Sequence, residues 1–420
     1  MRNKSRNLLS RFTVVALCAF LIIPGAPTIA STKLPTLDIT KGFRVSNTSE
    51  IVGFTKLGDN WVISGVNDQE RSWLALVNQK GEELWRVFPV EIGNGGEGFL
   101  TAVSVDSQRI LVAGVSQNAL TLPGTPLPEA SPTNNGSPSP TPTPTSNPTS
   151  TQGKSVPLVN PDNVTPSEVK PLRKDIDRIF IAQFDLSGKL IAALSTENKS
   201  GFIPNSIASS STNIFLAGNE LIGENSSRGA LYKFSESSFL DSYSYGNQGT
   251  IFNQVIATST KSLTIIGSST ETLAERKVVG KADGVILTIS QSSGKITKLI
   301  RSSGAGAIRS WDFASGNLQV SGTSRTKTLQ EGVVTTFNSK GQVRWTARFQ
   351  KSTKALADGN CVALATSTSD VILYVVDSKG KQIKGVRIPK QELLALASNS
   401  PSGCAVLTSG SASGIRVSYL

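Results

Sequence analysis

Ile110-Leu-Val-Ala-Gly114 is one copy of an apolar phrase that this chain repeats. Each copy reads as a short strand that ends in a small residue. Four close copies and two looser ones are Trp61-Val-Ile-Ser-Gly65, Ile214-Phe-Leu-Ala-Gly218, Leu263-Thr-Ile-Ile-Gly267, Leu318-Gln-Val-Ser-Gly322, Cys361-Val-Ala-Leu-Ala365 and Cys404-Ala-Val-Leu-Thr408. A second apolar stretch in five units runs into a turn glycine, at Gly81, Gly188, Gly294, Gly341 and Gly380. A repeat of this length made only of strands predicts a β-propeller.

Each repeat divides into four strands, which in the first unit are expected at 51–57, 61–66, 73–78 and 83–90. The last unit has strands at 392–398, 404–409 and 415–420, and then the chain ends without a fourth. The stretch 37–45 precedes the first unit and has no partner of its own, so we expect it to supply that missing outer strand. The prediction is an all-β, seven-bladed propeller of four-stranded antiparallel blades, closed by its N-terminal strand.

The N-terminus has the pattern of a secretory signal peptide. Basic residues lead into an apolar run from Phe12 to Ile23, and Thr28-Ile-Ala30 offers small residues for cleavage after Ala30. We therefore expect residues 1–30 to be a signal and 31–420 to be one propeller domain, secreted or attached to the cell envelope. No transmembrane domain is expected in the mature chain, although an uncleaved anchor is the alternative.

Residues 119–175 interrupt the second repeat between its second and third strands. They hold 13 of the 20 prolines and are rich in Ser and Thr. Such a composition cannot bury enough apolar surface to offset its ordering entropy, so the segment is expected to be disordered. Two interpretations stay open: a tolerated surface insertion, or an arm that is glycosylated or threads the cell wall.

Export would leave Cys361 and Cys404 in a compartment that permits disulfides. They lie one repeat apart and both begin the second strand of their unit. Equivalent positions in neighbouring blades tend to exceed the 7 Å between Cα atoms that a bridge allows. A disulfide and a pair of buried thiols therefore both remain open.

The chain contains no His, so several classes of catalytic and metal site cannot be present. Ser-His-Asp and Cys-His nucleophiles, His bases and most zinc or copper sites cannot be built. The formal charge of +12 is spread along the chain, without the clustered basic stripe typical of nucleic-acid binding. Residues 93–98 read G-x-G-x-x-G but precede a strand, so they predict a loop between blades. No metal, cofactor or nucleic acid is expected.

The repeats resemble the β-propeller repeat family of secreted bacterial proteins, in phrases such as AVSVDSQRILVAGVS (102–116), DRIFIAQFDLSGKLI (177–191) and GVVTTFNSKGQVRW (332–345). This resemblance implies an exported scaffold without a defined catalytic set. The pattern Asn-x-x-Gly-x-x-x-Trp, which ends at Trp85 and Trp345, resembles the tryptophan-docking motif of quinoprotein-like propellers. It implies that these two rings pack between blades and bind no cofactor.

Two regions offer candidate binding residues. The loops that join second to third strands vary most and share one face, where functional residues usually lie on a rigid scaffold. The candidates on these loops are Arg228, Arg276, Lys277 and Arg325. The first strands line the central channel and contribute Arg309 and Trp311, beside Thr101, Asn253, Gln254 and Lys354. Alternation along a strand turns only half of its residues inward. The phase is open, and Trp311 also fits packing between blades.

These observations favour an exported, monomeric, non-enzymatic binding or scaffold protein with a protein or glycan partner. The alternative is a carbohydrate-active hydrolase or lyase with a carboxylate pair at the channel mouth, which needs two acids about 5–10 Å apart. A quinone- or metal-assisted oxidoreductase is a third reading, which the missing His disfavours.

Overall fold

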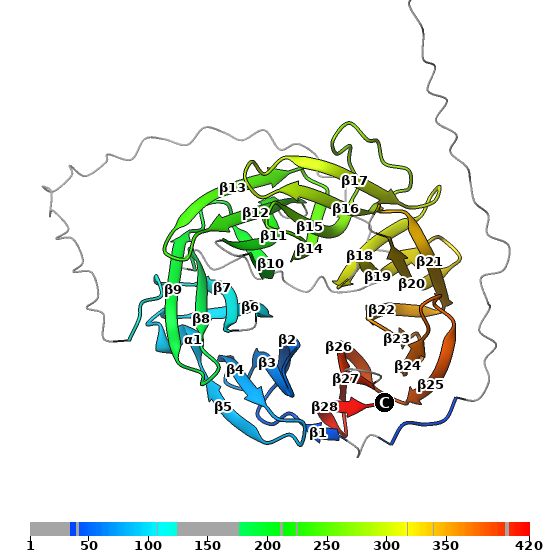
Figure 1. Cartoon of the computed structure of the whole chain (residues 1–420), viewed down its shortest axis with the longest axis horizontal. Helices are drawn as coiled ribbons and strands as arrows, with labels where there is room; N and C mark the ends of the chain where they lie inside the picture. The colour runs from blue at the N-terminus through cyan, green and yellow to red at the C-terminus, as the bar shows by residue number, and fades with distance from the viewer. Residues whose placement is uncertain are drawn as a thin grey trace, which may run out of the picture.

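Seven four-stranded antiparallel sheets stand as blades around a central axis, as predicted (Figure 1). The computed structural model describes residues 34–38, 42–106, 108–123, 176–210, 213–223, 226–316, 318–338, 340–399 and 403–420. The expected signal peptide and most of the expected disordered insertion lie outside these residues. Within the described part of the chain, no helix is long and apolar enough to cross a membrane.

Each blade runs outward from the axis in chain order. The strands of the first three blades are β2 (Glu50–Leu57), β3 (Asn60–Val66), β4 (Ser72–Val77) and β5 (Glu83–Val87); β6 (Gly98–Val105), β7 (Ile110–Ser116), β8 (Arg178–Phe184) and β9 (Leu190–Glu197); and β10 (Phe202–Ser209), β11 (Ile214–Gly223), β12 (Ser226–Phe234) and β13 (Phe239–Tyr245). Blades 4 and 5 are β14 (Thr250–Ala257), β15 (Ser262–Ser269), β16 (Asp283–Ser290) and β17 (Ile296–Ser302), then β18 (Ile308–Ser315), β19 (Gln319–Arg325), β20 (Gln330–Phe337) and β21 (Val343–Gln350).

Blades 6 and 7 complete the ring. Their strands are β22 (Ser352–Asp358), β23 (Cys361–Thr366), β24 (Val371–Val376) and β25 (Gln382–Ile388), then β26 (Glu392–Asn399), β27 (Gly403–Gly410), β28 (Gly414–Tyr419) and, from the other end of the chain, β1 (Gly42–Arg44). The N-terminal strand pairs with β28 in antiparallel register, with Phe43 opposite Val417. The predicted closure of the ring by the N-terminus is therefore confirmed.

The closing segment is more elaborate than the single strand expected over 37–45. Gly42–Arg44 pair with β28 of blade 7, and Val45 N donates to Ile415 O at 2.9 Å. The preceding residues lie beside β25 of blade 6 as a short parallel bridge, in which Leu37 N donates to Arg387 O at 2.8 Å and Arg387 N donates to Pro35 O at 2.9 Å. The N-terminal segment thus holds the rims of two neighbouring blades (Figure 1).

The repeated glycine turns join third to fourth strands and hold the outer rim together. In blade 2, Asp185 Oδ1 accepts from the backbone of Ser187 and Lys189, and Gly188 has a φ of 84°. That positive φ favours glycine, and a Cβ there would lie 2.7 Å from the ring of Trp85 on blade 1. Trp85 Nε1 also donates to Leu186 O at 3.0 Å. Trp85 therefore packs between blades, as the tryptophan-docking resemblance implies, and Trp345 lies over Gly380 in the same way.

Two expected boundaries need correction. The outer strand of blade 1 ends at Val87 rather than at residue 90, because Pro89 begins a single helical turn, α1 (Pro89–Ile92). Residues 119–123, expected to belong to the insertion, lie against the ring: Leu120 is buried and its N–H donates to Ser195 Oγ at 2.9 Å.

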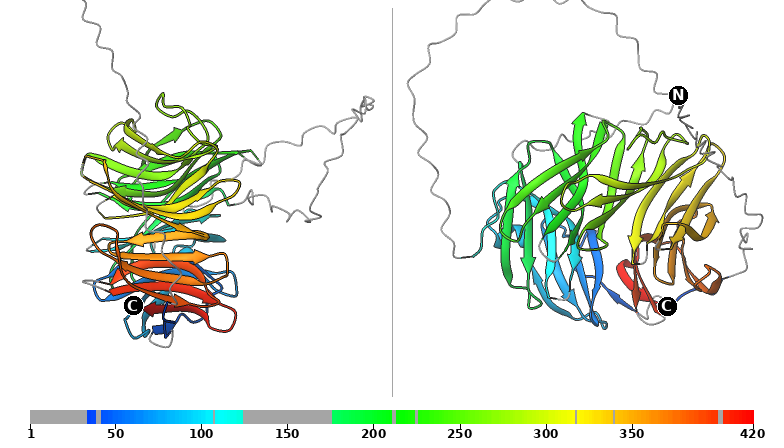
Figure 2. Two further views of the ribbon diagram at one scale, coloured as in Figure 1. Left: turned by 90° about the vertical axis from the view of Figure 1, so that its right-hand side faces the viewer. Right: turned by 45° about the horizontal axis from the view of Figure 1, so that its top comes forward.

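The core consists of one apolar cluster in each of the seven seams between blades. Each blade contributes side chains from both faces, so its strands read as nearly continuous apolar runs. The sheets stand face to face in the side view (Figure 2). The innermost strands border the central channel, which is one candidate site. The seams between blades extend to the face that carries the second-to-third loops, which is the other.

Candidate binding face, central channel and blade seams

The central channel has a volume of about 310 Å³ and is lined by the innermost strand of every blade. Each of these strands contains a β-bulge at the same position. The residues skipped in the pairing are Val52, Thr101, Asn205, Asn253, Asp312, Thr353 and Leu394. A bulge breaks the strict alternation of a strand. Consecutive residues such as Asn253 and Gln254 therefore both line the channel.

Polar side chains of the channel bind the backbone of the next blade. Asn205 Nδ2 donates to Phe252 O at 2.7 Å, and Asn253 Nδ2 donates to Trp311 O at 2.9 Å. Gln254 bonds both backbone groups of Ala314, donating at 2.9 Å and accepting at 2.6 Å. These amides tie blades 3, 4 and 5 together, so their hydrogen-bonding capacity is engaged by the ring itself.

Two charged side chains of opposite sign line the channel. Burial raises the pKa of Asp312, although a hydrogen bond from Ser310 and the charge of Lys354 oppose the shift. Burial lowers the pKa of Lys354, whose Nζ donates to Leu393 O at 3.1 Å and Leu394 O at 3.2 Å. Asp312 is the only carboxylate among the described residues that line the channel. The carboxylate pair that glycoside chemistry needs is thus not among them.

The second strands of the blades end, and the third strands begin, at one end of the ring. We call this the loop face; in blades 4 and 5 it carries the loops 270–282 and 326–329. Of the four residues predicted on these loops, Arg276 and Lys277 lie in the loop 270–282, whereas Arg228 lies in β12 and Arg325 is the last residue of β19. Arg276, Lys277 and Arg325 are exposed. Arg228 is held at the edge of this face, where Nε donates to the buried carboxylate of Glu220 at 2.6 Å.

The prediction that Arg309 and Trp311 face the channel is wrong. Because the bulge at Asp312 turns that residue inward, Trp311 points into the seam between blades 4 and 5. Its ring is fully buried there, and a Cβ on Gly284 would lie 2.7 Å from Trp311 Nε1. Arg309 enters the same seam and is 7% exposed. Packing between blades, the alternative left open for Trp311, is the arrangement observed.

Charged side chains lie near Trp311 in this seam and on the other face of blade 4. In the seam itself, Arg348 Nη1 donates to Glu331 at 2.6 Å. On the face of blade 4 toward blade 3, Arg301 Nη1 donates to the buried Asp283 at 3.1 Å. Arg309 has no carboxylate of its own: Nη1 donates to Ser302 Oγ at 2.5 Å, while its buried Nε has no hydrogen-bond partner. Burial, aided by repulsion from Arg348, lowers the pKa of Arg309 to about 10. Arg309 is therefore a buried cation at neutral pH.

Sequence reasoning missed these ion pairs, although a signal for them exists. Three blades carry an acid at or just before the third strand and an arginine 17 or 18 residues later in the fourth. The pairs are Asp283 with Arg301, Glu331 with Arg348, and Asp370 with Arg387. The spacing can be seen in the sequence, but only the hairpin register shows that it brings the acid and the arginine together.

Exposed apolar side chains gather on the loop face of blades 2 to 5. These residues are Phe99, Leu122, Leu221, Ile222, Ile251, Val279, Ile308 and Leu329. The other large exposed apolar side chains of the described chain lie at the opposite end of the blades, near the outer rim. Val279, with 62% exposure, is the most accessible member on the loop face.

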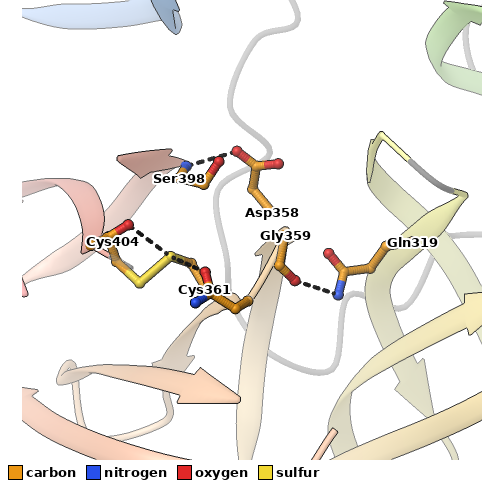
Figure 3. The surroundings of a disulfide bond; sticks show 8 residues. Gln319, Asp358, Gly359, Cys361, Ser398 and Cys404 are labelled. Atoms are coloured by element: carbon orange, nitrogen blue, oxygen red, sulfur yellow. Dashed lines mark hydrogen bonds between the residues drawn. A yellow bond between two sulfur atoms is a disulfide. The ribbon is translucent and has the colours of Figure 1, made fainter. Parts of the chain in front are cut away.

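The seam between blades 6 and 7 contains a disulfide instead of charges. It joins Cys361 at the start of β23 to Cys404 at the start of β27, with the Cα atoms 5.7 Å apart. The expectation that equivalent positions lie too far apart does not apply here, because these strand starts meet in the buried cluster of the seam. Flanking bonds hold the strand ends: Asp358 Oδ2 accepts from Ser398 N at 2.7 Å, and Gly359 O accepts from Gln319 Nε2 at 3.0 Å (Figure 3).

Among the described residues, no group of three or more His, Cys, Asp or Glu side chains lies close enough together to hold a metal ion.

No family model and no curated protein matches this chain. Similar solved structures include a chain in the crystal structure of a mitotic checkpoint complex, with 8% identity, TM-score 0.47 and coverage of 94% of this chain and 95% of that one. The β-propeller domain of the trilobed protease from Pyrococcus furiosus has 9% identity, TM-score 0.45 and coverage of 88% and 94%. Quinohemoprotein alcohol dehydrogenase from Comamonas testosteroni has 7% identity, TM-score 0.43 and coverage of 91% and 76%. These likenesses are too distant to support a functional argument.

Proposed function

We propose that this protein is an exported, non-enzymatic binding or scaffold protein that holds its partner on the loop face. One observation carries the proposal: the exposed apolar side chains of blades 2 to 5 lie on that face, which also carries the basic residues Arg276, Lys277 and Arg325. Exposed apolar and basic side chains on one face are a common feature of protein interaction sites.

The channel is a weaker candidate because its polar groups already serve the ring. Asn205, Asn253, Gln254 and Lys354 bind backbone atoms of the next blade. A ligand in the channel would have to compete with these internal bonds. A partner on the loop face would instead cover side chains that are partly exposed to solvent.

Export is part of the proposal and rests on the sequence of residues 1–30. A basic start, an apolar run and small residues before Ser31 are the features that a signal peptidase requires. Terminal sequencing of the protein recovered outside the cells tests it. A chain that begins at Ser31 supports export, and a chain that retains its first residues inside the cells contradicts it.

The partner site is tested by comparing two paired substitutions. In one variant, Val279→Asp and Leu329→Asp place charges among the apolar side chains of the loop face. In the matched control, Val343→Asp and Ile383→Asp place charges on exposed apolar residues of the outer rim, at 55% and 68% exposure.

Each protein is immobilised and used to capture partners from an extract of the source cells. We expect the wild-type and rim variant to retain the same partner and the loop-face variant to lose it by at least about tenfold, because charges in an apolar contact cost more than 1.4 kcal/mol. A capture set that is identical for all three proteins contradicts the proposal.

A further inference from the structure

The seam between blades 4 and 5 contains more positive than negative charge. Arg309 and the half-exposed Arg348 supply two guanidinium groups, and Glu331 supplies one carboxylate. Glu331 already accepts from Arg348, and Asp283, on the other face of blade 4, already accepts from Arg301. Arg309 lies within electrostatic reach of both acids and of Arg348, and it is bonded to neither acid. One positive charge is therefore left without a matched counter-charge.

A buried charge without a partner opposes folding. Removing a guanidinium from water costs several kcal/mol unless an opposite charge and hydrogen bonds replace the lost hydration. Arg309 receives partial compensation from Ser302 Oγ and from the ring of Trp311, whose centroid lies 5.6 Å from Cζ. Neither group carries a negative charge, and Arg309 Nε remains without a partner.

The connection between β17 and β18 lies at the loop-face end of this seam and is exposed. A Cβ on Gly304 or Gly306 would meet no atom within 4 Å. Lys281 N donates to Ala307 O at 2.7 Å, which places an exposed basic residue beside this connection. Arg325, also exposed, follows Ser324, the residue paired with Arg309 across β18 and β19. Two exposed basic residues thus lie near the loop-face end of the seam.

We propose that this seam binds an oxyanion, such as a carboxylate, sulfate or phosphate group, with Arg309 as its principal ligand. The anion supplies the negative charge that the seam lacks, and the planar guanidinium offers Nε as a free donor. Lys281 and Arg325 attract the anion to the loop-face end of the seam. The site uses no residue of the channel, and it extends the proposed function from a face that binds a partner to one that reads an acidic group.

The proposal is tested by thermal unfolding in the presence of anions. Sodium sulfate is raised from 0 to 20 mM while NaCl keeps the ionic strength constant. We expect a saturable rise in the Tm of the wild-type protein of about 1–3 °C, because a ligand of the folded state alone stabilises it in proportion to the logarithm of its concentration. Arg309→Gln removes the charge, so the rise should vanish in this variant.

Two further variants and two further anions complete the test. Arg276→Gln, on the exposed loop of the same face, should respond to sulfate as the wild type does. Arg309→Lys keeps the charge but loses the planar fork, so it should retain only part of the rise; it also serves if Arg309→Gln does not fold. Acetate and poly-L-glutamate replace sulfate in parallel titrations. A larger effect of the polymer identifies carboxylates of a polypeptide as the source, and a larger effect of sulfate identifies a small free oxyanion.

A sulfate response of equal size in the wild-type and Arg309→Gln proteins overturns the proposal, as does the lack of any saturable response to all three anions. Either result leaves the loop face untouched, because the captures with Val279→Asp and Leu329→Asp do not involve Arg309. Loss of the partner in those captures together with a normal sulfate response supports both proposals independently.

Discussion

The seam between blades 6 and 7 and the seam between blades 4 and 5 are formed by the same repeat but contain different side chains. Between blades 6 and 7, apolar side chains surround the Cys361–Cys404 disulfide, and the N-terminal segment bridges the two rims. Between blades 4 and 5, an apolar cluster around Trp311 lies next to the guanidiniums of Arg309 and Arg348 and the carboxylate of Glu331. The first seam contains only features that stabilise the ring. The second contains Arg309, whose buried charge opposes folding. We therefore assign it a role in binding.

The largest expected effect lies in the closing strand next to the first seam. Phe43 is buried between β28 and blade 1, where a Cβ on Gly81 would lie 2.2 Å from its side chain. Phe43→Ala should lower the free energy of unfolding by about 3–5 kcal/mol, because it removes a large core side chain from the strand that closes the ring. Denaturant unfolding measures this loss. Ile383→Ala, at a 68% exposed position of the outer strand of blade 6, is the control and should cost less than about 1 kcal/mol. Equal losses would mean that the closing strand has no special role.

The disulfide is the next largest contribution to the closed seam. Replacing both Cys361 and Cys404 with Ala should lower the free energy of unfolding by about 2–4 kcal/mol, since the bond restricts the unfolded chain over a separation of 43 residues. Both side chains are fully buried. A reductant should therefore have little effect on the folded protein and should match the double variant only once the chain has been unfolded. Rapid reduction under native conditions would contradict this burial.

The smallest effect is expected at Glu271, beside the connection between blades 3 and 4. Desolvation opposes the shift, but hydrogen bonds from the N–H groups of Asn247 and Gly249 and from Thr250 Oγ1 lower the pKa of Glu271. A lowered carboxyl pKa stabilises the folded state at pH values above the unfolded pKa, and this contribution disappears as the pH falls through the folded value. Glu271→Gln should therefore cost about 1 kcal/mol at pH 7 and less at pH 3. Unfolding measured at both pH values checks this, and a loss that does not depend on pH would exclude the carboxylate as its cause.

Much of the architecture was predictable because it follows from the types of residue at each position. The apolar phrases gave the second strands, the turn glycines gave the hairpins, and the missing last strand pointed to the N-terminus. The seven bulges were not predictable, because a bulge is a property of backbone pairing and the bulged residues range from Val52 to Asp312 without a common type. This is why the orientation of Arg309 and Trp311 could not be derived. The acidic residues that pair with arginines 17 or 18 residues later lie on neighbouring strands, which only the hairpin register brings together.

The central claim is that Arg309 is a buried cation without a matched counter-charge. It is tested most directly by the free energies of unfolding of Arg309→Met and Arg301→Met in buffer without oxyanions. Met retains most of the apolar stem in both variants and removes the charge. We predict that Arg301→Met loses about 3 kcal/mol, because it leaves the buried Asp283 without its cation, and that Arg309→Met is within about 1 kcal/mol of the wild type or more stable than it. A loss in Arg309→Met as large as that in Arg301→Met would show that Arg309 is an ordinary structural partner and would contradict the account.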